Sequence, residues 1–358
     1  MDLAADDDPV RIGIIGLGNI GGYHAEFLGD VESADLVAGL DIDATARRAF
    51  AEEYDVETYA DRAELFDAVD AVVVTTPNRY HEEYTVAALA AGVGVLVEKP
   101  LAHTVESAER IAEAARTSDA VCMVGFNNRF SDPVEVLKHD IRTGRYGDVT
   151  HVEANYVRRR GIPGRGSWFT SKAVAGGGAL IDIGVHAVDL ALYFLDFPEV
   201  VEVSGTTRAE FGRGDDYAFL RQWGTDEGPE GFDVEDSASA FLRCADGRTV
   251  SLEVAWASNR PDSDEFVVRG TEAGATLDRG AHELTVYEAG IGGANHLSTT
   301  TVETRESVTH RAEQRAFVEA VREGTAHRNT VDQALSVQRV VDAVYRSAAE
   351  GRAVRLDE

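Results

Sequence analysis

The sequence predicts an α/β protein of two domains: a doubly wound N-terminal domain with a parallel sheet, and a C-terminal α+β domain with a large, mostly antiparallel sheet. Three observations predict this fold. Apolar runs and helical patterns alternate up to about residue 125, which is typical of βαβ units. Beyond about residue 129, strand-like runs follow one another through short turns, which favours antiparallel pairing. A length of 358 residues suits two domains of roughly 150 residues each.

The N-terminal elements alternate regularly. The expected strands are short and almost wholly apolar, as in a sheet covered on both faces; they are 10–15, 35–40, 71–75, 93–97 and 121–124. The expected helices are 22–28, 44–54, 81–91 and 105–117. We place the domain boundary near residue 128, so that the domains are 1–128 and 129–358.

The C-terminal domain begins with a helix and continues mainly as strands. The expected helices are 134–142, 179–195, 310–323 and 331–350. The expected strands are 149–157, 199–208, 237–244, 249–257, 265–270, 275–277 and 284–287. Residues 245–248 (ADGR) indicate a hairpin turn, and the Gly- and Asp-rich segment 210–233 indicates a surface insertion. The two terminal helices are expected to pack back on the N-terminal domain.

The charge of the chain excludes several classes of partner. A formal net charge of -29 repels phosphate backbones and anionic lipid, so we expect neither nucleic-acid nor membrane partners. All but three of the 34 basic residues are arginines. An acidic, lysine-poor composition of this kind resembles that of extreme halophiles, where molar salt screens charges over about 3 Å. An ordinary acidic protein is the alternative.

Only two cysteines are present, Cys122 and Cys244, which exclude a disulfide scaffold and a four-cysteine zinc site. We expect buried free thiols and no metal. The acidic segment 1–9 lacks the basic and apolar order of a secretion signal. No wholly apolar stretch reaches the roughly 18 residues of a membrane span, and we therefore expect a cytoplasmic protein.

A glycine motif follows the first strand. Gly16, Gly18 and Gly21 form G-x-G-x-x-G, with Asn19 and Ile20 between the last two glycines. The first glycine permits a tight turn, the second lets a pyrophosphate approach the helix N-terminus, and the third lets helix and strand pack closely. The motif predicts a Rossmann dinucleotide site. A glycine-rich turn in an unrelated α/β fold is the alternative.

Asp41 ends the second strand, 20 residues after Gly21. A carboxylate there would accept hydrogen bonds from the adenosine ribose and repel a 2′-phosphate, which favours NAD and leaves NADP open. Arg47 and Arg48 complicate this interpretation, because an arginine nearby could accept that phosphate. We expect both to be exposed helix residues.

Five further residues, Thr75, Pro77, Asn78, His81 and Glu98, are predicted to contact the cofactor at the carboxyl edge of the sheet. The segment Thr75-Thr76-Pro77-Asn78 follows the third strand, with His81 after it. His81 either bonds the cofactor or serves only in the first turn of the next helix. Glu98 ends the fourth strand, and it too is predicted to contact the cofactor.

Lys99 follows Glu98 and precedes Pro100. A lysine is compact and can change its protonation state, which arginine does not. In a chain that otherwise uses arginine, its presence favours a chemical or electrostatic role over a solvated surface lysine. A cis peptide bond before Pro100 would aim the lysine side chain.

Asp182 and His186 are four residues apart in a largely apolar helical segment, so they share one face. A buried acid and imidazole are costly unless they are paired or functional. Taken alone, the pair could equally be a structural hydrogen bond. Asp189 either shares the face of His186 or caps a neighbouring contact.

Five segments together resemble the Gfo/Idh/MocA family of oxidoreductases, which includes glucose-fructose oxidoreductase and inositol dehydrogenase. They are GLGNIGGYHAEFL, TTPNRYH, VEKPLA, GFNNRF and GGGALIDIGVHAVDLALYFL, and the resemblance extends over essentially the whole chain. It implies that Lys99, Asp182 and His186 form the catalytic set. It also implies a homodimer or homotetramer that assembles through the C-terminal sheet.

The implied reaction is the oxidation of a sugar, polyol or inositol hydroxyl by hydride transfer to nicotinamide. His186 would accept the hydroxyl proton as general base, because imidazole titrates nearest neutral pH. Lys99 would stabilise the developing alkoxide. Asp182 would orient the imidazole or bind a substrate hydroxyl.

Other residues are predicted to line the substrate site; they are Arg129, Asn155, Tyr156, Arg158, Arg160 and Trp168. The arginine run 158–160 either binds an anionic substrate group or pairs with surface acids. Trp168 either stacks on a sugar ring or packs in the core.

Two alternative functions remain at this stage. The first is a sugar oxidoreductase or glycosidase that keeps its cofactor bound and recycles it. The second is a non-catalytic dinucleotide sensor, against which the intact set of Lys99, Asp182 and His186 argues.

Overall fold

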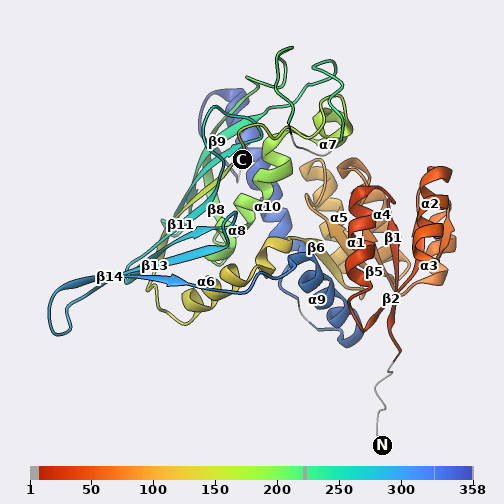
Figure 1. Ribbon diagram of the computed structural model, residues 1–358, viewed down its shortest axis with the longest axis horizontal. Helices are drawn as coiled ribbons and strands as arrows, with labels where there is room; N and C mark the ends of the chain where they lie inside the picture. The colour runs from red at the N-terminus through yellow and green to blue at the C-terminus, as the bar shows by residue number, and fades with distance from the viewer. Residues whose placement is uncertain (1–7, 221–223, 326, 357–358) are drawn as a thin grey trace, which may run out of the picture. The chain divides into compact units, whose positions relative to one another are not determined.

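The computed structural model describes residues 8–220, 224–325 and 327–356, and the chain divides into two compact units (Figure 1). The first unit comprises Met1–Ala102, Glu106–Asn127 and Val308–Leu335. The second comprises His103–Val105, Asn128–Ser307 and Ser336–Glu358. The principal division, after Asn127, lies one residue from the boundary expected at 128.

The first unit contains a parallel six-stranded sheet in the order β3-β2-β1-β4-β5-β6. Its central strands are almost completely buried, because both faces of a doubly wound sheet are covered. The order reverses between β1 and β4, which places the carboxyl ends of these strands where ligands bind in open α/β sheets. The strands are β1 (Val10–Ile15), β2 (Ala34–Leu40), β3 (Glu57–Tyr59), β4 (Ala71–Val74), β5 (Gly94–Glu98) and β6 (Cys122–Gly125).

Helices connect these strands and a late helix joins them. The connecting helices are α1 (Asn19–Leu28), α2 (Ala44–Tyr54), α3 (Arg62–Ala68), α4 (His81–Ala90) and α5 (Val105–Thr117). The short helices η1 (Asn78–Tyr80) and η2 (Asn127–Phe130) follow β4 and β6. The late helix α9 (Thr309–Glu323) contacts α1 and β1. It therefore brings distant residues of the chain to the glycine-motif helix.

The second unit is built on a nine-stranded sheet in the order β14-β13-β12-β11-β7-β10-β9-β8-β15. All neighbours pair antiparallel except β7 and β10, which pair parallel. The strands are β7 (Val149–Val157), β8 (Val200–Arg208), β9 (Ser237–Cys244), β10 (Thr249–Ala255), β11 (Ser263–Gly270), β12 (Ala273–Asp278), β13 (Glu283–Gly290), β14 (His296–Val302) and β15 (Val354–Arg355).

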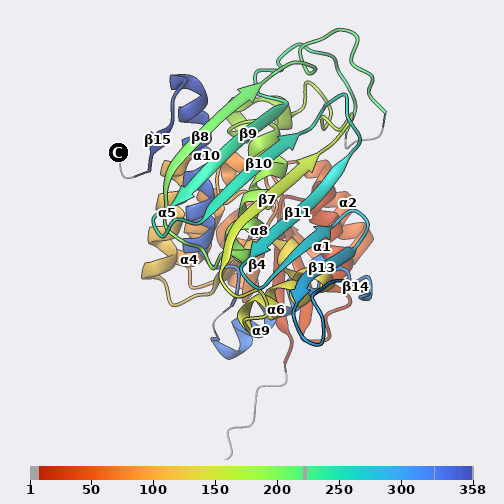
Figure 2. The same cartoon turned by 90° about the vertical axis from the view of Figure 1, so that its left-hand side faces the viewer.

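The helices α6 (Asp132–Arg142) and α8 (Val185–Phe194) and the π-helix η4 (Leu180–Gly184) pack on this sheet. The short helices η3 (Trp168–Thr170) and α7 (Lys172–Ala175) precede η4, and α10 (Val331–Glu350) begins in the first unit and continues into the second. Helix α8 packs on β7 and β10. Figure 2 looks onto the opposite face, where the strands lie in front and α8 and α10 behind them.

The helical stretch Lys172–Phe194 is long and apolar enough to cross a membrane by length and composition alone. Of its apolar window, 72% is buried inside the protein. Such burial is what the core helix of a folded domain shows.

The predicted fold class and most elements are confirmed, with specific omissions. The sequence pattern did not reveal β3, α3, α7, β14 or β15, which are short or polar. The parallel pairing of β7 with β10 was not predicted either. The expected hairpin at 245–248 joins β9 to β10. Both cysteines are buried free thiols, as predicted.

Candidate active site

The three motif glycines have the local geometry that the motif predicts. Gly16 has a φ of +95°, and a Cβ at Gly21 would lie 2.1 Å from the carbonyl oxygen of Gly16. Gly18 precedes α1, and nothing lies within 4 Å of the position that its Cβ would occupy. Gly18 and Asn19 are exposed and Ile20 is half-buried. The helix N-terminus is therefore open to a phosphate, and the residues present fit a dinucleotide.

Asp41 follows β2 and is hydrogen-bonded to the glycine loop. Its Oδ2 accepts from the backbone N of Leu17 at 2.8 Å, and its Oδ1 accepts from the backbone N of Asp43 at 2.8 Å. Each carboxylate oxygen has a second lone pair for a ribose hydroxyl. Arg47 is half-buried and donates to the carbonyl oxygen of Asp41 at 2.7 Å, whereas Arg48 is exposed. Arg47 was expected to be exposed, and its guanidinium instead lies beside Asp41.

The segment after β4 is tied to the glycine loop. The hydroxyl of Thr75 donates to the carbonyl oxygen of Gly16 at 2.7 Å. The buried Oγ1 of Thr76 has no hydrogen-bond partner among the described residues. Pro77 is half-buried and Asn78 is buried in η1. Thr75 thus links the loop after β4 to the glycine loop at the edge of the sheet. Pro77 and Asn78 lie in the same loop as Thr75, and we propose that they contact the cofactor.

His81 has a different role from the predicted cofactor contact. Its ring is 1% exposed. Nε2 lies 2.8 Å from the carbonyl oxygen of Thr76, and Nδ1 lies 2.9 Å from that of Pro100. Burial is the main cause that lowers the pKa of His81. Because both nitrogens face backbone carbonyls, the ring joins the loop after β4 to the loop after β5.

Glu98 ends β5 and uses both carboxylate oxygens within the protein. Oε1 lies 2.8 Å from Nε2 of His24, and Oε2 accepts from the backbone N of Lys99 at 3.0 Å. Burial alone would raise the pKa of Glu98. The hydrogen bond from His24 and the nearby positive charges outweigh it and lower the pKa to about 2. Glu98 is therefore a largely buried carboxylate next to Lys99, whose peptide bond to Pro100 is cis.

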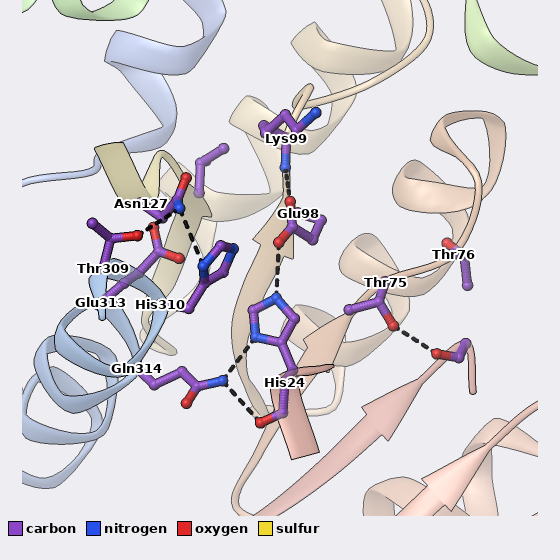
Figure 3. Close-up of polar contacts among 12 residues, drawn as sticks. His24, Thr75, Thr76, Glu98, Lys99, Asn127, Thr309, His310, Glu313 and Gln314 are labelled. Carbon is purple, nitrogen blue, oxygen red and sulfur yellow. Dashed lines mark hydrogen bonds and ion pairs between the residues drawn. The ribbon is translucent and has the colours of Figure 1, made fainter. Parts of the chain in front are cut away.

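Figure 3 shows His24 between Glu98 and Gln314, with His310 beside them. The potential ligand atoms of His24, Glu98 and His310 lie within 4.8 Å of one another, as in some metal sites. The Gln314 amide donates to Nδ1 of His24 at 2.8 Å, so Nε2 of His24 carries the proton that faces Glu98. A metal would have to displace that proton. The arrangement is a hydrogen-bonded chain that a cation would disrupt.

The lowered pKa of His310 predicts how the stability of the fold changes in acid. Burial is the largest cause that lowers its pKa to about 4; the charges of His24 and Lys99 add to the effect and that of Glu98 opposes it. The unfolded state, with a histidine pKa of 6.5, binds more protons between pH 6.5 and 4. Stability should therefore fall as pH falls through this window, by about 3 kcal/mol at most.

The measurement is denaturant unfolding at several pH values between 7 and 4. Replacing His310 with glutamine should flatten the wild-type curve in this window, since glutamine does not titrate. Parallel curves for the two proteins would contradict this account. The carboxylate of Glu98 changes stability in a lower pH window, between its ordinary pKa of 4.5 and its pKa of about 2 in the fold, so it does not mimic the effect.

Asp182 and His186 lie where the helix changes its winding. The predicted helix 179–195 is present, but Asp182 lies in the π-helix η4 and His186 in the first turn of α8. Both are half-buried between fully buried neighbours. π-Helical turns within α-helices are frequent at functional sites. The sequence pattern predicted the helix and the pair, and gave no signal for the π turn.

Trp256 is a site residue that the sequence did not reveal. It is fully buried, and its Nε1 donates to Oδ2 of Asp182 at 2.9 Å. Replacing Trp256 with phenylalanine should remove this hydrogen bond, release the carboxylate and lower kcat by about tenfold. Unfolding should become easier by about 1–3 kcal/mol. Steady-state kinetics and denaturant unfolding measure the two effects.

Phe266→Leu is the matched control, because Phe266 is a buried aromatic residue that packs edge-on against Phe194. That variant should lose stability and retain kcat. Equal kcat values in the Trp256 and Phe266 variants would contradict a role for Trp256 in positioning Asp182.

Glu235 is a second residue that sequence reasoning missed. It is 8% exposed and accepts from the backbone N of Gly178 at 3.0 Å and of Leu180 at 2.9 Å. The hydroxyl of Tyr345 donates to it at 2.9 Å. Burial raises the pKa of Glu235, and these donors oppose the shift. The carboxylate caps the helix that carries Asp182 and His186.

The prediction that Arg129 binds substrate is wrong. Its side chain is fully buried and donates to both oxygens of Asp189, at 3.0 and 2.5 Å. The guanidinium also lies 4.8 Å from the ring centre of Tyr193 and 5.0 Å from that of Phe197. Burial raises the pKa of Asp189 and the charge of Arg129 opposes it. The pair is a structural ion pair inside the second unit.

The burial pattern of β7 places Asn155, a predicted substrate contact, away from the helices of the second unit. In β7, buried Val152 and Ala154 face the helices. Asn155 follows Ala154 directly, and in the sheet it lies opposite Glu253 of β10 and Glu265 of β11. Successive side chains of a strand point to opposite faces. Asn155 therefore lies on the sheet face opposite to the one on which α8 packs.

The arginine run makes no ion pair with any acid in the described part of the chain. Arg158 donates to the hydroxyl of Tyr156 at 3.0 Å, and the charge of Asp182 helps to raise its pKa against the opposing effect of burial. Arg160 donates to the carbonyl oxygen of Ser258 at 2.8 Å. The interpretation as surface salt bridges is therefore wrong. Trp168 is half-buried, and its ring centre lies 3.8 Å from that of Phe169, on which it stacks. Stacking on a sugar ring and packing in the core are both compatible with this position.

Comparison with known proteins identifies both units. Residues 10–126 match the family described as oxidoreductases with an NAD-binding Rossmann fold. Residues 134–276 match the GFO/IDH/MocA C-terminal domain.

The chain also resembles characterised proteins along its whole length. It is 32% identical to the D-glucoside 3-dehydrogenase of Escherichia coli over 99% of this chain and 100% of the relative. It is 28% identical to the NAD-dependent scyllo-inositol 2-dehydrogenase of Bacillus subtilis over 97% and 96%. A levoglucosan dehydrogenase solved with NADH shares the fold, with a TM-score of 0.85, 23% identity and coverage of 98% of this chain and 99% of that one. The chain therefore belongs to the GFO/IDH/MocA family of NAD-binding oxidoreductases.

Proposed function

We propose that this enzyme is an NAD(P)-dependent dehydrogenase that oxidises a secondary hydroxyl of a sugar or polyol, and that the C3 hydroxyl of a D-glucoside is its first candidate substrate. The observation that carries the proposal is the full-length similarity to a D-glucoside 3-dehydrogenase in a chain that retains Lys99, Asp182 and His186. The two relatives are both named dehydrogenases. The cofactor-recycling and sensor alternatives gain no support from them.

The catalytic roles follow from the chemistry of each side chain. When bound, NAD(P) supplies the group that accepts the hydride. His186 removes the hydroxyl proton as general base. Lys99 stabilises the alkoxide that develops on the same oxygen. Asp182, held by the indole of Trp256, orients the imidazole or binds a neighbouring substrate hydroxyl.

The experiment is a screen of NAD and NADP reduction over methyl glucosides, free aldoses, inositols and sugar acids in molar salt. The proposal predicts reduction with a methyl D-glucoside and a 3-keto product. Reduction with inositols alone would move the substrate class to polyols. Stoichiometric cofactor bound after purification, with no net reduction by any substrate, would overturn the proposal.

We propose NAD as the preferred cofactor, with NADP as the alternative. The carboxylate of Asp41 repels a 2′-phosphate, and the Arg47 guanidinium beside it is held by a backbone carbonyl. The ratio of kcat/KM for the two cofactors tests this preference. A ratio that favours NADP would reverse it and assign the phosphate to Arg47.

We make two proposals for the substrate site. In the first, the exposed part of the Trp168 ring stacks on a sugar ring of the substrate. Arg158 and Arg160 lie in the second unit and form no ion pair in the described part of the chain, so they suit a polar or anionic substituent. A change in sugar KM in Trp168→Leu would support the first proposal, and an unchanged KM would contradict it.

We propose that a second copy of the chain covers one face of the nine-stranded sheet, in a homodimer or homotetramer. This is the face opposite to the one on which α8 packs. That face exposes Phe241 (36%) and Tyr287 (45%), on strands of the same sheet. Analytical ultracentrifugation tests assembly, and a monomer at micromolar concentration would contradict it. We also propose that the strongly acidic, lysine-poor chain is adapted to molar salt. Its melting temperature should rise steeply from low to molar salt, and a flat response would contradict salt adaptation.

A further inference from the structure

We propose that His24 and Gln314 are positioning residues of the reaction, which fix Glu98 and, through it, the backbone that carries Lys99. This inference rests on the proposed function, because it assigns a role around the catalytic lysine. The chain of contacts lies wholly within the first unit. It runs from Gln314 on α9 through His24 on α1 to Glu98 at the end of β5, as Figure 3 shows.

The amide of Gln314 determines the tautomer of His24. Its Nε2 donates to the backbone carbonyl oxygen of His24 at 3.0 Å and lies 2.8 Å from Nδ1 of the same residue. A carbonyl oxygen accepts only from a donor, so this atom is the amide nitrogen and not the amide oxygen. Nδ1 of His24 is therefore the acceptor, and the ring proton lies on Nε2.

The proton on Nε2 of His24 points at the carboxylate of Glu98. The two groups are 2.8 Å apart, with the imidazole fully buried and the carboxylate side chain 12% exposed. The remaining oxygen, Oε2, accepts from the backbone N of Lys99 at 3.0 Å. The carboxylate of Glu98 thus connects the imidazole of His24 to the backbone N–H of Lys99, the residue with the catalytic side chain.

The neighbouring strand approaches Glu98 so closely that a side chain at Gly125 would crowd the carboxylate. A Cβ at Gly125, on the neighbouring strand β6, would lie 3.2 Å from the Cα of Glu98 and 3.3 Å from its Oε2. His24 and Gln314 are both fully buried, so water does not compete for their hydrogen bonds. Both ring nitrogens of His24 and both carboxylate oxygens of Glu98 are engaged in hydrogen bonds, although Oε1 of Gln314 has no partner among the described residues. A buried chain of this kind favours one arrangement. Without it, Glu98 could rotate and release the Lys99 peptide.

His24→Leu removes the donor to Glu98, and His24→Gln returns an N–H donor at a similar reach. At saturating NAD and sugar, we expect His24→Leu to lower kcat by roughly 10- to 100-fold, the size of a misplacement of about 1 Å. The sugar KM should stay within about threefold of wild type. His24→Gln should recover most of the loss, and Gln314→Leu should lie between the two.

Leu65→Ala is the matched control, because Leu65 is fully buried in the same unit on α3, outside the chain of contacts. It should lower the melting temperature and leave kcat unchanged. A His24→Leu kcat within twofold of wild type would overturn the proposal. So would equal impairment in His24→Leu and His24→Gln, since the donor would then be irrelevant.

A readout independent of turnover separates this inference from the proposed function. In ¹⁵N-histidine spectra, the signal absent from His24→Gln identifies His24. That signal should show the Nε2-protonated tautomer in the wild type, and Gln314→Leu should broaden it or shift it toward a mixture. An Nδ1-protonated His24 in the wild type would overturn the proposal even for an enzyme active on glucosides. The expected tautomer in an enzyme inactive on every sugar would instead refute only the proposed function.

Discussion

Replacing Lys99 with methionine is expected to lower kcat by roughly three orders of magnitude while the Kd for NAD changes less than threefold. Methionine keeps the length of the side chain and removes its charge and its donors. The loss of a group that stabilises a developing oxyanion costs about 10²–10³ in rate. Steady-state kinetics in molar salt and NAD titration by calorimetry measure the two quantities.

Lys172→Met is the matched control, because Lys172 is an exposed lysine at the start of α7. Its kcat should equal that of the wild type. A Lys99 variant with more than a tenth of wild-type kcat would contradict the catalytic assignment. A Lys99 variant that fails to bind NAD would instead place the residue in the cofactor site.

Replacing Arg129 with methionine is expected to destabilise the fold by about 3–5 kcal/mol, because Asp189 would remain as an uncompensated buried charge. The side chains of this pair are 0% and 1% exposed. Denaturant unfolding measures the loss. The effect arises in folding and not in substrate binding, which is the correction that the structure makes to the sequence-based prediction.

The double variant Arg129→Met, Asp189→Leu keeps the test decisive if the single variant does not fold. Replacing both partners with apolar groups should recover most of the stability, and the sugar KM should stay within threefold of wild type. A single variant destabilised by less than 1 kcal/mol would contradict the structural role. A double variant with a tenfold higher KM would return Arg129 to the substrate site.

The elements with long apolar patterns were predictable, since burial on one or both faces leaves a periodic signal. The strands β1, β2, β4, β5 and β6 and the helices α2 and α5 are close to their expected bounds. The omissions have a physical cause. β3 and β15 have three and two residues, respectively, too few for any period, and β14 is mostly exposed and polar.

Motif residues were predictable where the backbone itself sets their role. Gly16 and Gly21 are constrained by a positive φ and by a close approach of the chain, and such constraints act locally on the sequence. The position of Asp41 after β2 follows from the same local spacing.

Side chains whose role depends on a distant partner were not predictable. Arg129 pairs with Asp189, 60 residues away, and Gln314 reaches His24 across 290 residues. Trp256 and Glu235 act on the π-helical segment from other parts of the chain. No spacing in the sequence records such contacts, because the fold alone brings their partners together.

The fate of the hydrogen on the oxidised carbon is the most direct test of hydride transfer from the sugar to NAD. Wild-type enzyme in molar salt is supplied with NAD and methyl D-glucoside deuterated at C3, and both products are analysed by mass spectrometry. The account predicts one deuterium in the reduced nicotinamide for each 3-keto glucoside formed, and no such transfer in Lys99→Met. Reduced cofactor without deuterium, or turnover of the glucoside with no net reduction of NAD, would contradict it.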